Sequence, residues 1–425
     1  MDKTFFQFND KLIALANEIE NDLKQRFAEI DTVTEYNQQK VLSAFIRHGV
    51  SESHFTPTTG YGYGDRGRDK LDEVFADIFE TEDALVRHSI LSGTHAIAIA
   101  LFGILCPGDI LLAATGRPYD TLHQVIGIQE KNAGSLAEMG VEYKEVPLNA
   151  DGKPDLEGIV TALEAYPAVK MVHIQRSKGY ATRPSLHINE IGEIVQAVRS
   201  VRKDVVIFVD DCYGEFVEKH EPTAVGADLM AGSLIKNAGG GIAENGGYIC
   251  GKKDLVERCS YRMTTPGLGR EIGASLGHNR TLFMGLFYAP HVTGEALKTA
   301  VFAAALMEKM GFKAEPASTA PRADIIETLY LENPEALIAF CRGLQGGSPV
   351  DAFVVPEPSE MPGYDSDVIM AAGAFTMGAS IELSADAPLR EPFAVFMQGG
   401  LHYHSGKIGI LNAAQKLLDE GIVRL

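Results

Sequence analysis

A lysine at the end of an apolar segment is the residue of this chain with the clearest chemical capacity. Lys236 follows the segment 232–235 and precedes an asparagine and the glycine-rich run 238–241. In an apolar, partly desolvated setting, a lysine amine has a lowered pKa and can form a Schiff base with an aldehyde. The glycines permit close approach of the backbone, and Ser233 can donate a hydrogen bond to a phosphate oxygen. A lysine taken alone is more often a solvated residue at a strand end, so Lys236 needs partners before a function is inferred.

An acidic residue ends a second apolar segment. Asp210 follows Phe208 and Val209, and the carboxyl end of a buried strand is where open α/β sheets place ligands. A buried carboxylate that keeps a pyridine nitrogen protonated turns a cofactor ring into an electron sink, which carbanion chemistry at an amino acid requires. The alternative is that Asp210 or Asp211 caps the helix that follows.

A candidate phosphate site comes earlier in the chain. Ser92, Gly93 and Thr94 open a helical stretch that runs to Leu101. Free backbone N–H groups at a helix start bind anions, and a glycine there lets a phosphate come close. The alternative is an N-cap at Ser92 or Thr94 of a purely structural helix. Each of the three features is weak alone, whereas their order and spacing together indicate a cofactor site.

The elements that must position these residues alternate between helix and strand. Helices are predicted at 71–79 and from Ser92 onward, with a strand-like segment at 84–90 between them. Such alternation predicts an α/β fold with a parallel or mostly parallel sheet and crossover helices. The further predicted strands are largely apolar, as expected of strands covered on both faces. They are Ile110–Ala113, Val141–Val146, Lys170–Ile174, Val205–Val209, Leu229–Ile235 and Gly247–Cys250.

The two ends of the chain have different patterns. Apolar residues recur at helical spacing over 8–30 and 36–50, and the Gly-, Thr- and Tyr-rich segment 51–70 is a loop too aromatic for a simple linker. After Ala289 the pattern changes to a second α+β domain. Its predicted elements are a helix His291–Met310, strands Ile325–Tyr330, Ala352–Val355 and Ser380–Leu383, and a helix Asn412–Glu420. We predict an N-terminal helical arm and loop at 1–60, a large domain at 61–290 and a small domain at 291–425.

Composition excludes several classes of partner. The 425 residues are 45% hydrophobic and 22% charged, as in ordinary globular proteins, and the formal net charge of -19 disfavours nucleic acid and anionic lipid surfaces. No apolar run is long enough to span a bilayer and no signal-peptide pattern is present, so we expect a cytoplasmic protein without a membrane partner. The five cysteines are never spaced as C-x-x-C, and His402 and His404 have no acidic partner nearby in sequence, so we predict no metal site.

Taken together, these motifs resemble the fold-type I enzymes that depend on pyridoxal 5′-phosphate (PLP), and within them the cystathionine β-lyase and methionine γ-lyase group. The chain is most similar to the methionine γ-lyase-related "aluminium resistance" proteins. The similarity covers nearly the whole chain and includes GYGYGDRGRDKL, LSGTHAIA, FVDDCYGEF, SLIKNAGGGIAENGGYICG, TTPGLGREIGAS and ASIELSADAPLREP. It implies a seven-stranded, mostly parallel sheet sandwiched by helices, a smaller C-terminal α+β domain and an N-terminal helical arm.

The resemblance also implies roles for individual residues. Lys236 would be the Schiff-base lysine, and Asp210 the partner of the pyridinium nitrogen. Tyr119 would stack on the cofactor and donate a proton to the leaving group. The phosphate-binding residues that it implies are Ser92, Gly93, Thr94 and Ser233.

A shared active site is the next implication. In this group a Tyr-x-Arg stretch reaches across a dimer interface to the neighbour's phosphate, and the candidates here are Tyr61, Tyr63, Arg66 and Arg68. The spacing leaves the choice among them open. We expect a homo-oligomer, either a dimer or a dimer of dimers, with shared sites.

Two departures from the group's pattern concern the phosphate and the substrate. Ile235 stands where the lyases have a threonine before the lysine. The segment Glu382-Leu383-Ser384 matches an Arg-Leu-Ser whose arginine binds the substrate carboxylate, and a glutamate there would repel it. Arg390 or Arg176 would have to take over that task.

The implied activity is that of a PLP-dependent carbon-sulfur lyase. It would eliminate a thiol from a small amino acid such as cystathionine, cysteine or methionine and release a 2-oxo acid and ammonia. The same residues would serve an aminotransferase, and a catalytically weak PLP-fold protein is a further alternative. A nucleotide phosphate loop at 246–252 is disfavoured, because Lys253 stands where a Mg²⁺-binding hydroxyl is needed.

Overall fold

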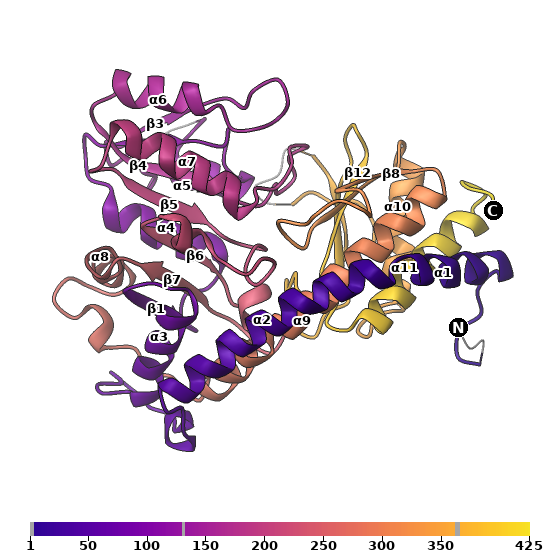
Figure 1. Cartoon of the computed structure of the whole chain (residues 1–425), viewed down its shortest axis with the longest axis horizontal. Helices are drawn as coiled ribbons and strands as arrows, with labels where there is room; N and C mark the ends of the chain where they lie inside the picture. Colours follow the sequence, from indigo (N-terminus) through magenta and orange to yellow (C-terminus); the bar gives the residue numbers. More distant parts are fainter. Residues whose placement is uncertain (1–3, 130–131, 362–365) are drawn as a thin grey trace. The chain divides into compact units, whose positions relative to one another are not determined.

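The computed structural model describes residues 4–129, 132–361 and 366–425, and in it the chain forms two compact units (Figure 1). One unit takes in the chain up to Tyr36 and again from Ala289 onward, and the other is Asn37–Tyr288. The division into 1–60, 61–290 and 291–425 stays a prediction. Among the described residues, no helix is both long and apolar enough to cross a lipid bilayer.

The central unit is built on a seven-stranded sheet with the order β1-β7-β6-β5-β4-β2-β3. Only β7 runs antiparallel to its neighbours β1 and β6, so the predicted α/β fold with a mostly parallel sheet is confirmed. The strands are β1 (Asp83–Arg87), β2 (Ile110–Ala113), β3 (Glu142–Glu145), β4 (Val169–Gln175), β5 (Val206–Asp210), β6 (Leu229–Ser233) and β7 (Gly247–Gly251). The helices of this unit are α3 (Arg66–Ile78), α4 (Gly93–Ile104), α5 (Asp120–Ile126), α6 (Leu156–Ala165), α7 (Ile188–Val201) and α8 (Lys253–Met263).

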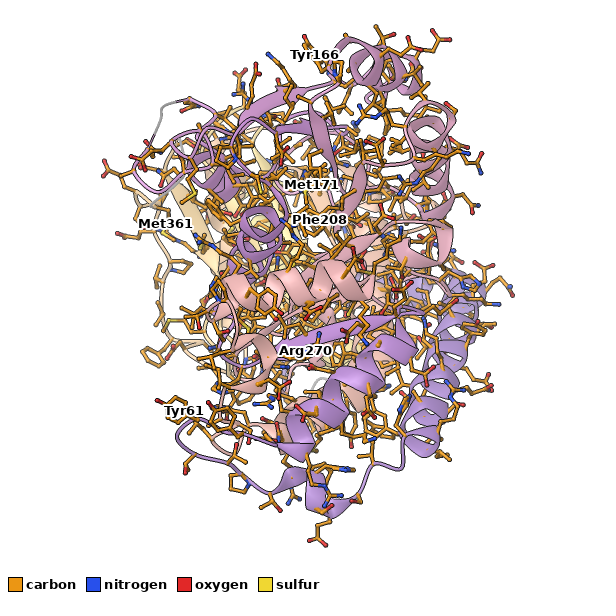
Figure 2. All side chains as sticks on the ribbon, turned by 90° about the vertical axis from the view of Figure 1, so that its left-hand side faces the viewer. Tyr61, Tyr166, Met171, Phe208, Arg270 and Met361 are labelled. Atoms are coloured by element: carbon orange, nitrogen blue, oxygen red, sulfur yellow. The ribbon has the colours of Figure 1, made fainter. Side chains whose placement is uncertain are left out.

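The two faces of this sheet are packed by different side chains because successive residues of a strand point to opposite sides. On one face, α4 and α8 pack on every second residue of β4 to β7, including Met171, Phe208, Ala231 and Ile249. On the other, aromatic rings of α3 pack on Tyr248. Figure 2 shows Met171 and Phe208 in the interior of the molecule. Strands covered on both sides explain why their sequences are almost wholly apolar.

The other unit contains a five-stranded antiparallel sheet with the order β10-β11-β12-β9-β8. Its strands are β8 (Lys313–Glu315), β9 (Glu327–Tyr330), β10 (Val368–Ala371), β11 (Ser384–Pro388) and β12 (Ala394–Gln398). Helices α10 (Pro334–Gly346) and α11 (Tyr403–Asp419) pack against each other beside it, and α1 (Asp10–Asp22) belongs to the same unit. Two long helices, α2 (Lys24–Arg47) and α9 (Asn279–Lys309), continue from one unit into the other.

Several predicted boundaries were wrong. Helix α9 begins at Asn279 rather than at His291 and contains Pro290, because the apolar residues on either side of that proline are buried and their packing outweighs one lost backbone hydrogen bond. Helix α11 likewise begins earlier, at Tyr403. Strand β6 ends at Ser233, so Lys236 stands in the turn after the strand.

Two predicted strands of the unit that contains the five-stranded sheet do not form. Ala352–Val355 lies in a turn and irregular backbone, and Ser380–Leu383 lies in turns immediately before β11. Short apolar runs do not distinguish a strand from a loop: Phe353 and Val355 are exposed on an irregular segment, whereas Ile381 and Leu383 are buried from a turn.

Candidate active site

The ends of β5 and β6 bring an acid and a hydroxyl onto the same side of the sheet. Val206 and Phe208 of β5 and Leu229 and Ala231 of β6 all belong to the core under α4. By the same alternation, the last residues of these strands, Asp210 and Ser233, face α4 as well. The carboxyl edge of the parallel strands is the edge at which such sheets bind ligands.

Gly93 joins this edge from the start of α4. A Cβ at that glycine would lie 3.0 Å from Cys212 Sγ, 3.4 Å from Ser233 Cβ and 3.9 Å from Lys236 Nζ. The start of α4, Ser233 and Lys236 therefore meet around one point, and the Asp210 carboxylate interacts electrostatically with Lys236. The space kept open by the missing side chain is bounded by an amine, a hydroxyl and a helix N-terminus.

The hydroxyls at the start of α4 have different partners. Ser92 is the N-cap, and its side chain accepts a hydrogen bond from the backbone N–H of His95. Thr94 Oγ1 lies 2.8 Å from Thr121 Oγ1 at the start of α5. Ser92 thus serves the helix end in this arrangement, whereas Thr94 ties α4 to the segment that carries Tyr119.

Lys236 sits in a strongly acidic pocket. Its Nζ lies 3.9 Å from the centre of the Tyr213 ring. Burial acts to lower the pKa of Lys236, but the acidic groups around it, Cys212 and Tyr213 first and then the carboxylates of Asp210 and Glu215, raise it above its ordinary value. The lowered pKa expected from an apolar setting is therefore wrong for the chain by itself, because that expectation considered only desolvation.

Burial and hydrogen bonds with two backbone N–H groups hold Asp210 in place. Its side chain is almost fully buried, and its Oδ1 accepts a hydrogen bond of 3.1 Å from the N–H of Cys212. Its own carbonyl accepts from the N–H of Arg176 at 3.0 Å. The carboxylate orientation is thus set by the turn that follows β5.

Tyr119 is placed by a residue that the sequence did not point out. Its backbone N–H donates to Gln175 Oε1 at 2.7 Å, and its ring lies edge-on to Tyr180 with 5.7 Å between centroids. Gln175 ends β4 in register with Asp210. A Cβ at Gly179 would come within 2.8 Å of the Tyr119 ring, so that glycine is needed. The alternation of side chains along β4 could have pointed to Gln175, because Gln175 lies on the same face of the strand as Met171.

The Tyr-rich loop before α3 is organised by a buried carboxylate. Asp65 caps α3 and accepts hydrogen bonds from the N–H of Arg68, from Thr58 and from Asn279; despite its burial, these bonds lower the pKa of Asp65 to about 2. Arg68 is itself buried and donates to the carbonyls of Gly62 and Gly273. Arg68 therefore braces its own loop.

The rest of that loop is presented to the outside. Tyr61 and Tyr63 are 67% and 60% exposed and stack on each other with 5.4 Å between ring centroids. Arg66, the first residue of α3, is also exposed, and Figure 2 shows Tyr61 at the rim of the molecule. Of the four loop residues predicted from the sequence, these three are the ones available to another chain.

Arg176 belongs to a buried ion cluster on the opposite face of the sheet. It is fully buried and pairs with Asp211 at 2.9 Å, Glu218 at 3.0 Å and Glu221 at 3.2 Å. It is therefore not available to a substrate carboxylate, contrary to the expectation from the sequence, because three carboxylates already surround it. Arg390 is exposed after β11 in the other unit.

Glu382 also has a different role from the one expected. The residue is buried, and its two carboxylate oxygens accept hydrogen bonds from the backbone N–H groups of Phe375 and Thr376 at 2.8 and 2.9 Å. It pins the loop before β11 within its own unit. Charge sign alone suggested repulsion of a substrate, but the carboxylate is engaged by the backbone.

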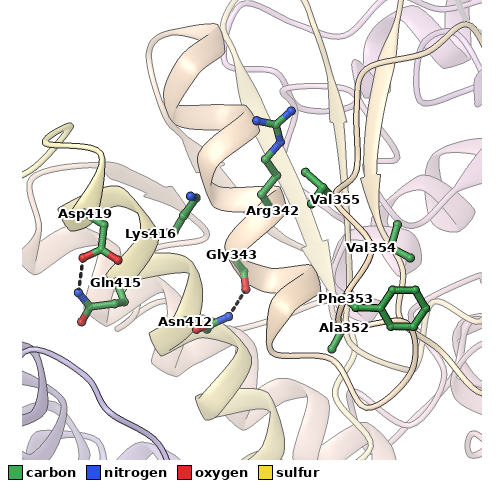
Figure 3. A pocket seen from close by; sticks show the side chains of 10 residues that line it. All are labelled: Arg342, Gly343, Ala352, Phe353, Val354, Val355, Asn412, Gln415, Lys416 and Asp419. Carbon is green, nitrogen blue, oxygen red and sulfur yellow. Dashed lines mark hydrogen bonds between the residues drawn. The ribbon is translucent and has the colours of Figure 1, made fainter.

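A separate cavity of about 310 Å³ lies within the unit that contains the five-stranded sheet (Figure 3). Helices α10 and α11 and the segment 352–355 line it. None of the predicted site residues is among its lining residues, which are Arg342, Gly343, Ala352, Phe353, Val354, Val355, Asn412, Gln415, Lys416 and Asp419. The segment predicted as a strand is thus a cavity wall.

Comparison with known proteins assigns the chain to a family. The family model described as methionine gamma-lyase matches residues 12–418. The chain belongs to this family. An uncharacterised Bacillus subtilis protein, YnbB, is 50% identical over 409 residues, covering 96% of this chain and 97% of its own. A solved structure described as a carbon-sulfur lyase involved in aluminum resistance, from Clostridium novyi, is 51% identical with a TM-score of 0.93 and covers 96% of each chain.

More distant structures agree on the fold. The pyridoxal-5′-phosphate-dependent protein YhfS from Escherichia coli is 18% identical with a TM-score of 0.62, and the match covers 92% of this chain and 97% of that one. The fold-type I architecture expected from the sequence is confirmed.

The residues at the edge of the central sheet fit PLP. Lys236 offers an amine for the aldehyde and Asp210 a carboxylate for the ring nitrogen. The start of α4, Gly93 with its open space, and Ser233 offer hydrogen-bond donors for the phosphate. Each of these groups matches one part of the cofactor in chemical type.

Proposed function

We propose that the protein is a PLP-dependent carbon-sulfur lyase that releases a thiol, ammonia and a 2-oxo acid from a sulfur amino acid such as cystathionine, cysteine or methionine. The observation that carries the proposal is the meeting of Lys236, Asp210, Ser233 and Gly93 at the carboxyl edge of the sheet in a member of the methionine gamma-lyase family. The bound cofactor would supply an electron sink for carbanion chemistry at the α-carbon.

The chain's own residues would supply binding and proton transfer. Lys236 would hold the cofactor, and its free amine would take the α-proton of the substrate as a general base. Asp210, oriented by the N–H of Cys212, would hold the ring nitrogen of the cofactor. Tyr119, fixed through Gln175, donates the proton that the departing sulfur needs. For methionine, Lys236 also removes the proton at the β-carbon.

The cofactor assignment is tested by identifying the lysine to which PLP attaches. Protein incubated with PLP should turn yellow, and borohydride reduction followed by peptide mapping should find the label on Lys236. Lys236→Ala should abolish the label, while Lys253→Ala, which changes an exposed lysine at the start of α8, should not. A protein that stays colourless with added PLP, or a label on another lysine, contradicts the proposal.

The reaction is tested with the three candidate substrates. Cystathionine, cysteine and methionine are each incubated with the loaded protein, and 2-oxo acid and free thiol are measured. Equal release of both supports the lyase. Stoichiometric conversion of PLP to pyridoxamine phosphate without thiol would instead identify an aminotransferase, and no turnover of any kind would favour the catalytically weak alternative.

We also propose that the active protein is a homo-oligomer with shared sites. What supports this is the exposure of Tyr61, Tyr63 and Arg66 on a loop that Asp65 and Arg68 hold rigid. Mixing two inactive chains, Lys236→Ala and Arg66→Ala, should restore part of the activity if the loop completes a partner's site. Hybrids that form without any rescue would contradict it.

A further inference from the structure

A buried histidine under the candidate site has no partner in the described chain. His173 is 1% exposed, and neither ring nitrogen forms a hydrogen bond with any residue of 4–129, 132–361 or 366–425. Its ring lies 5.7 Å from that of Phe208. Burying an imidazole without partners costs free energy that an apolar residue would not cost, so packing alone does not account for a histidine at this position.

The sheet register places His173 next to Asp210. Strands β4 and β5 run parallel, with His173 opposite Phe208 and Gln175 opposite Asp210. His173 and Asp210 are therefore diagonal neighbours on the face that carries α4, with the histidine one step deeper in the sheet. The histidine is thus one step further from the carboxyl edge than Asp210, and the Asp210 carboxylate acts on its ring electrostatically.

Burial keeps the His173 ring neutral. Burial lowers the pKa of His173 to about 4, the Asp210 carboxylate opposes that change, and Arg183 reinforces it. Arg183 itself donates to the carbonyls of Gln175 and Ser177. A neutral imidazole carries one N–H donor and one acceptor nitrogen. One donor is thus available beside a buried carboxylate at neutral pH.

We propose that His173 is a positioning residue for Asp210. When the cofactor is bound, the imidazole N–H, which has no partner among the described residues, donates to the buried side of the Asp210 carboxylate and leaves the other side to the ring nitrogen of the cofactor. The inference rests on the proposed function and adds to it a residue that touches neither substrate nor cofactor. Through Asp210, His173 sets how firmly the cofactor is held and how strongly its ring nitrogen is kept protonated.

The test replaces the donor and measures cofactor binding rather than turnover. His173→Phe should weaken PLP binding to the apoprotein about tenfold or more, the effect of losing one hydrogen bond to a charged group. The pH midpoint of the visible absorbance of the loaded protein should move upward, because a less firmly protonated ring nitrogen favours protonation at Lys236. The melting temperature of the apoprotein should stay level or rise, since an unpartnered polar ring is removed.

Two further variants separate this role from packing. His173→Gln keeps an N–H donor and should bind PLP close to the wild-type affinity. His173→Leu also removes the donor and takes the place of His173→Phe in the test if the phenylalanine variant does not fold. Phe208→Leu, which disturbs the same packing, should lower the melting temperature without moving the pH midpoint.

The outcomes are distinguishable from failure of the cofactor assignment. If the wild-type protein binds no PLP, the proposed function is wrong. If the wild type binds PLP and the apolar variants bind it equally well with an unchanged pH midpoint, His173 is only a core residue and the inference is overturned.

Discussion

Asp210 and Asp211 are adjacent in sequence and lie on opposite faces of the central sheet. Asp210 faces α4 together with Ser233, near Lys236, and its carboxylate accepts a hydrogen bond from the backbone N–H of Cys212. Asp211 is fully buried on the other face and pairs with Arg176. The same residue type thus serves a candidate catalytic site on one face and a structural ion cluster on the other.

The structural cluster holds more acid than its cation can neutralise. Arg176 is shared by Asp211, Glu218 and Glu221, and Glu215 lies nearby with a hydrogen bond from Tyr248 at 2.8 Å. Burial is the main cause that raises the pKa of Asp211 to about 7 and those of Glu215 and Glu221 to about 8. The face with Asp210 is therefore arranged for chemistry with a ligand. The carboxyl groups on the face with Arg176 bind protons within the fold.

The largest expected effect comes from removing the shared cation. Arg176→Met should lower the free energy of unfolding by about 3–5 kcal/mol at neutral pH, because three carboxylates lose the counter-charge that they share. Urea denaturation measures this loss. The loss should shrink at pH 5, where Asp211 and Glu221 are protonated; a pH-independent loss would mean that the cluster is not ionised as described.

The two adjacent aspartates give the most direct test of the comparison. Asp210→Asn should lower kcat about 10²–10³-fold through lost electrostatic stabilisation while leaving the unfolding free energy nearly unchanged. Asp211→Asn should do the reverse, with activity within a few-fold of wild type and reduced stability. Steady-state kinetics and urea denaturation of both variants check this. Similar effects of the two substitutions on both measurements would remove the distinction between the faces.

A smaller effect is expected in the pH dependence of stability. A carboxyl with a raised pKa in the folded state binds its proton more tightly when folded, so the stability that it contributes is present at low pH and is lost as pH rises toward the folded pKa. Stability of the apoprotein should therefore fall between about pH 5 and pH 8 as Asp211, Glu215 and Glu221 ionise. Glu215→Gln should reduce that slope by at most about 1.4 kcal/mol per pH unit, the contribution of one proton. An unchanged slope would show that Glu215 does not titrate in this range.

The smallest effects on stability are expected in the Tyr-rich loop. Arg66→Ala changes an exposed residue and should alter the unfolding free energy by no more than about 0.5 kcal/mol. Arg68→Ala removes donors to two buried carbonyls and should cost more, about 1–3 kcal/mol. Thermal unfolding compares the two. Equal, small effects would mean that Arg68 does not brace the loop.

Much of the fold could be predicted because its signals are local. Apolar runs covered on both faces gave the positions of β2, β4, β5 and β7 to within a residue or two, and Ser92 marked the start of α4. The boundaries that were wrong, such as the start of α9 and the segments 352–355 and 380–383, depend on what packs against them. Burial of the residues around Pro290 is not visible in their own sequence.

For the candidate site, the sequence by itself determined the residue types and the strand ends at which they stand. Lys236, Asp210, Ser233 and the start of α4 follow from apolar runs that end in polar residues, and their roles remain predictions. Only the tertiary structure decided which face each side chain occupies and what surrounds it. It assigned Arg176 to three carboxylates, Glu382 to two backbone N–H groups and Arg68 to its own loop. The reason is physical: the charge and hydrogen-bonding capacity of a residue are local, but its partners come from strands and turns that are distant in sequence and are brought together only by packing.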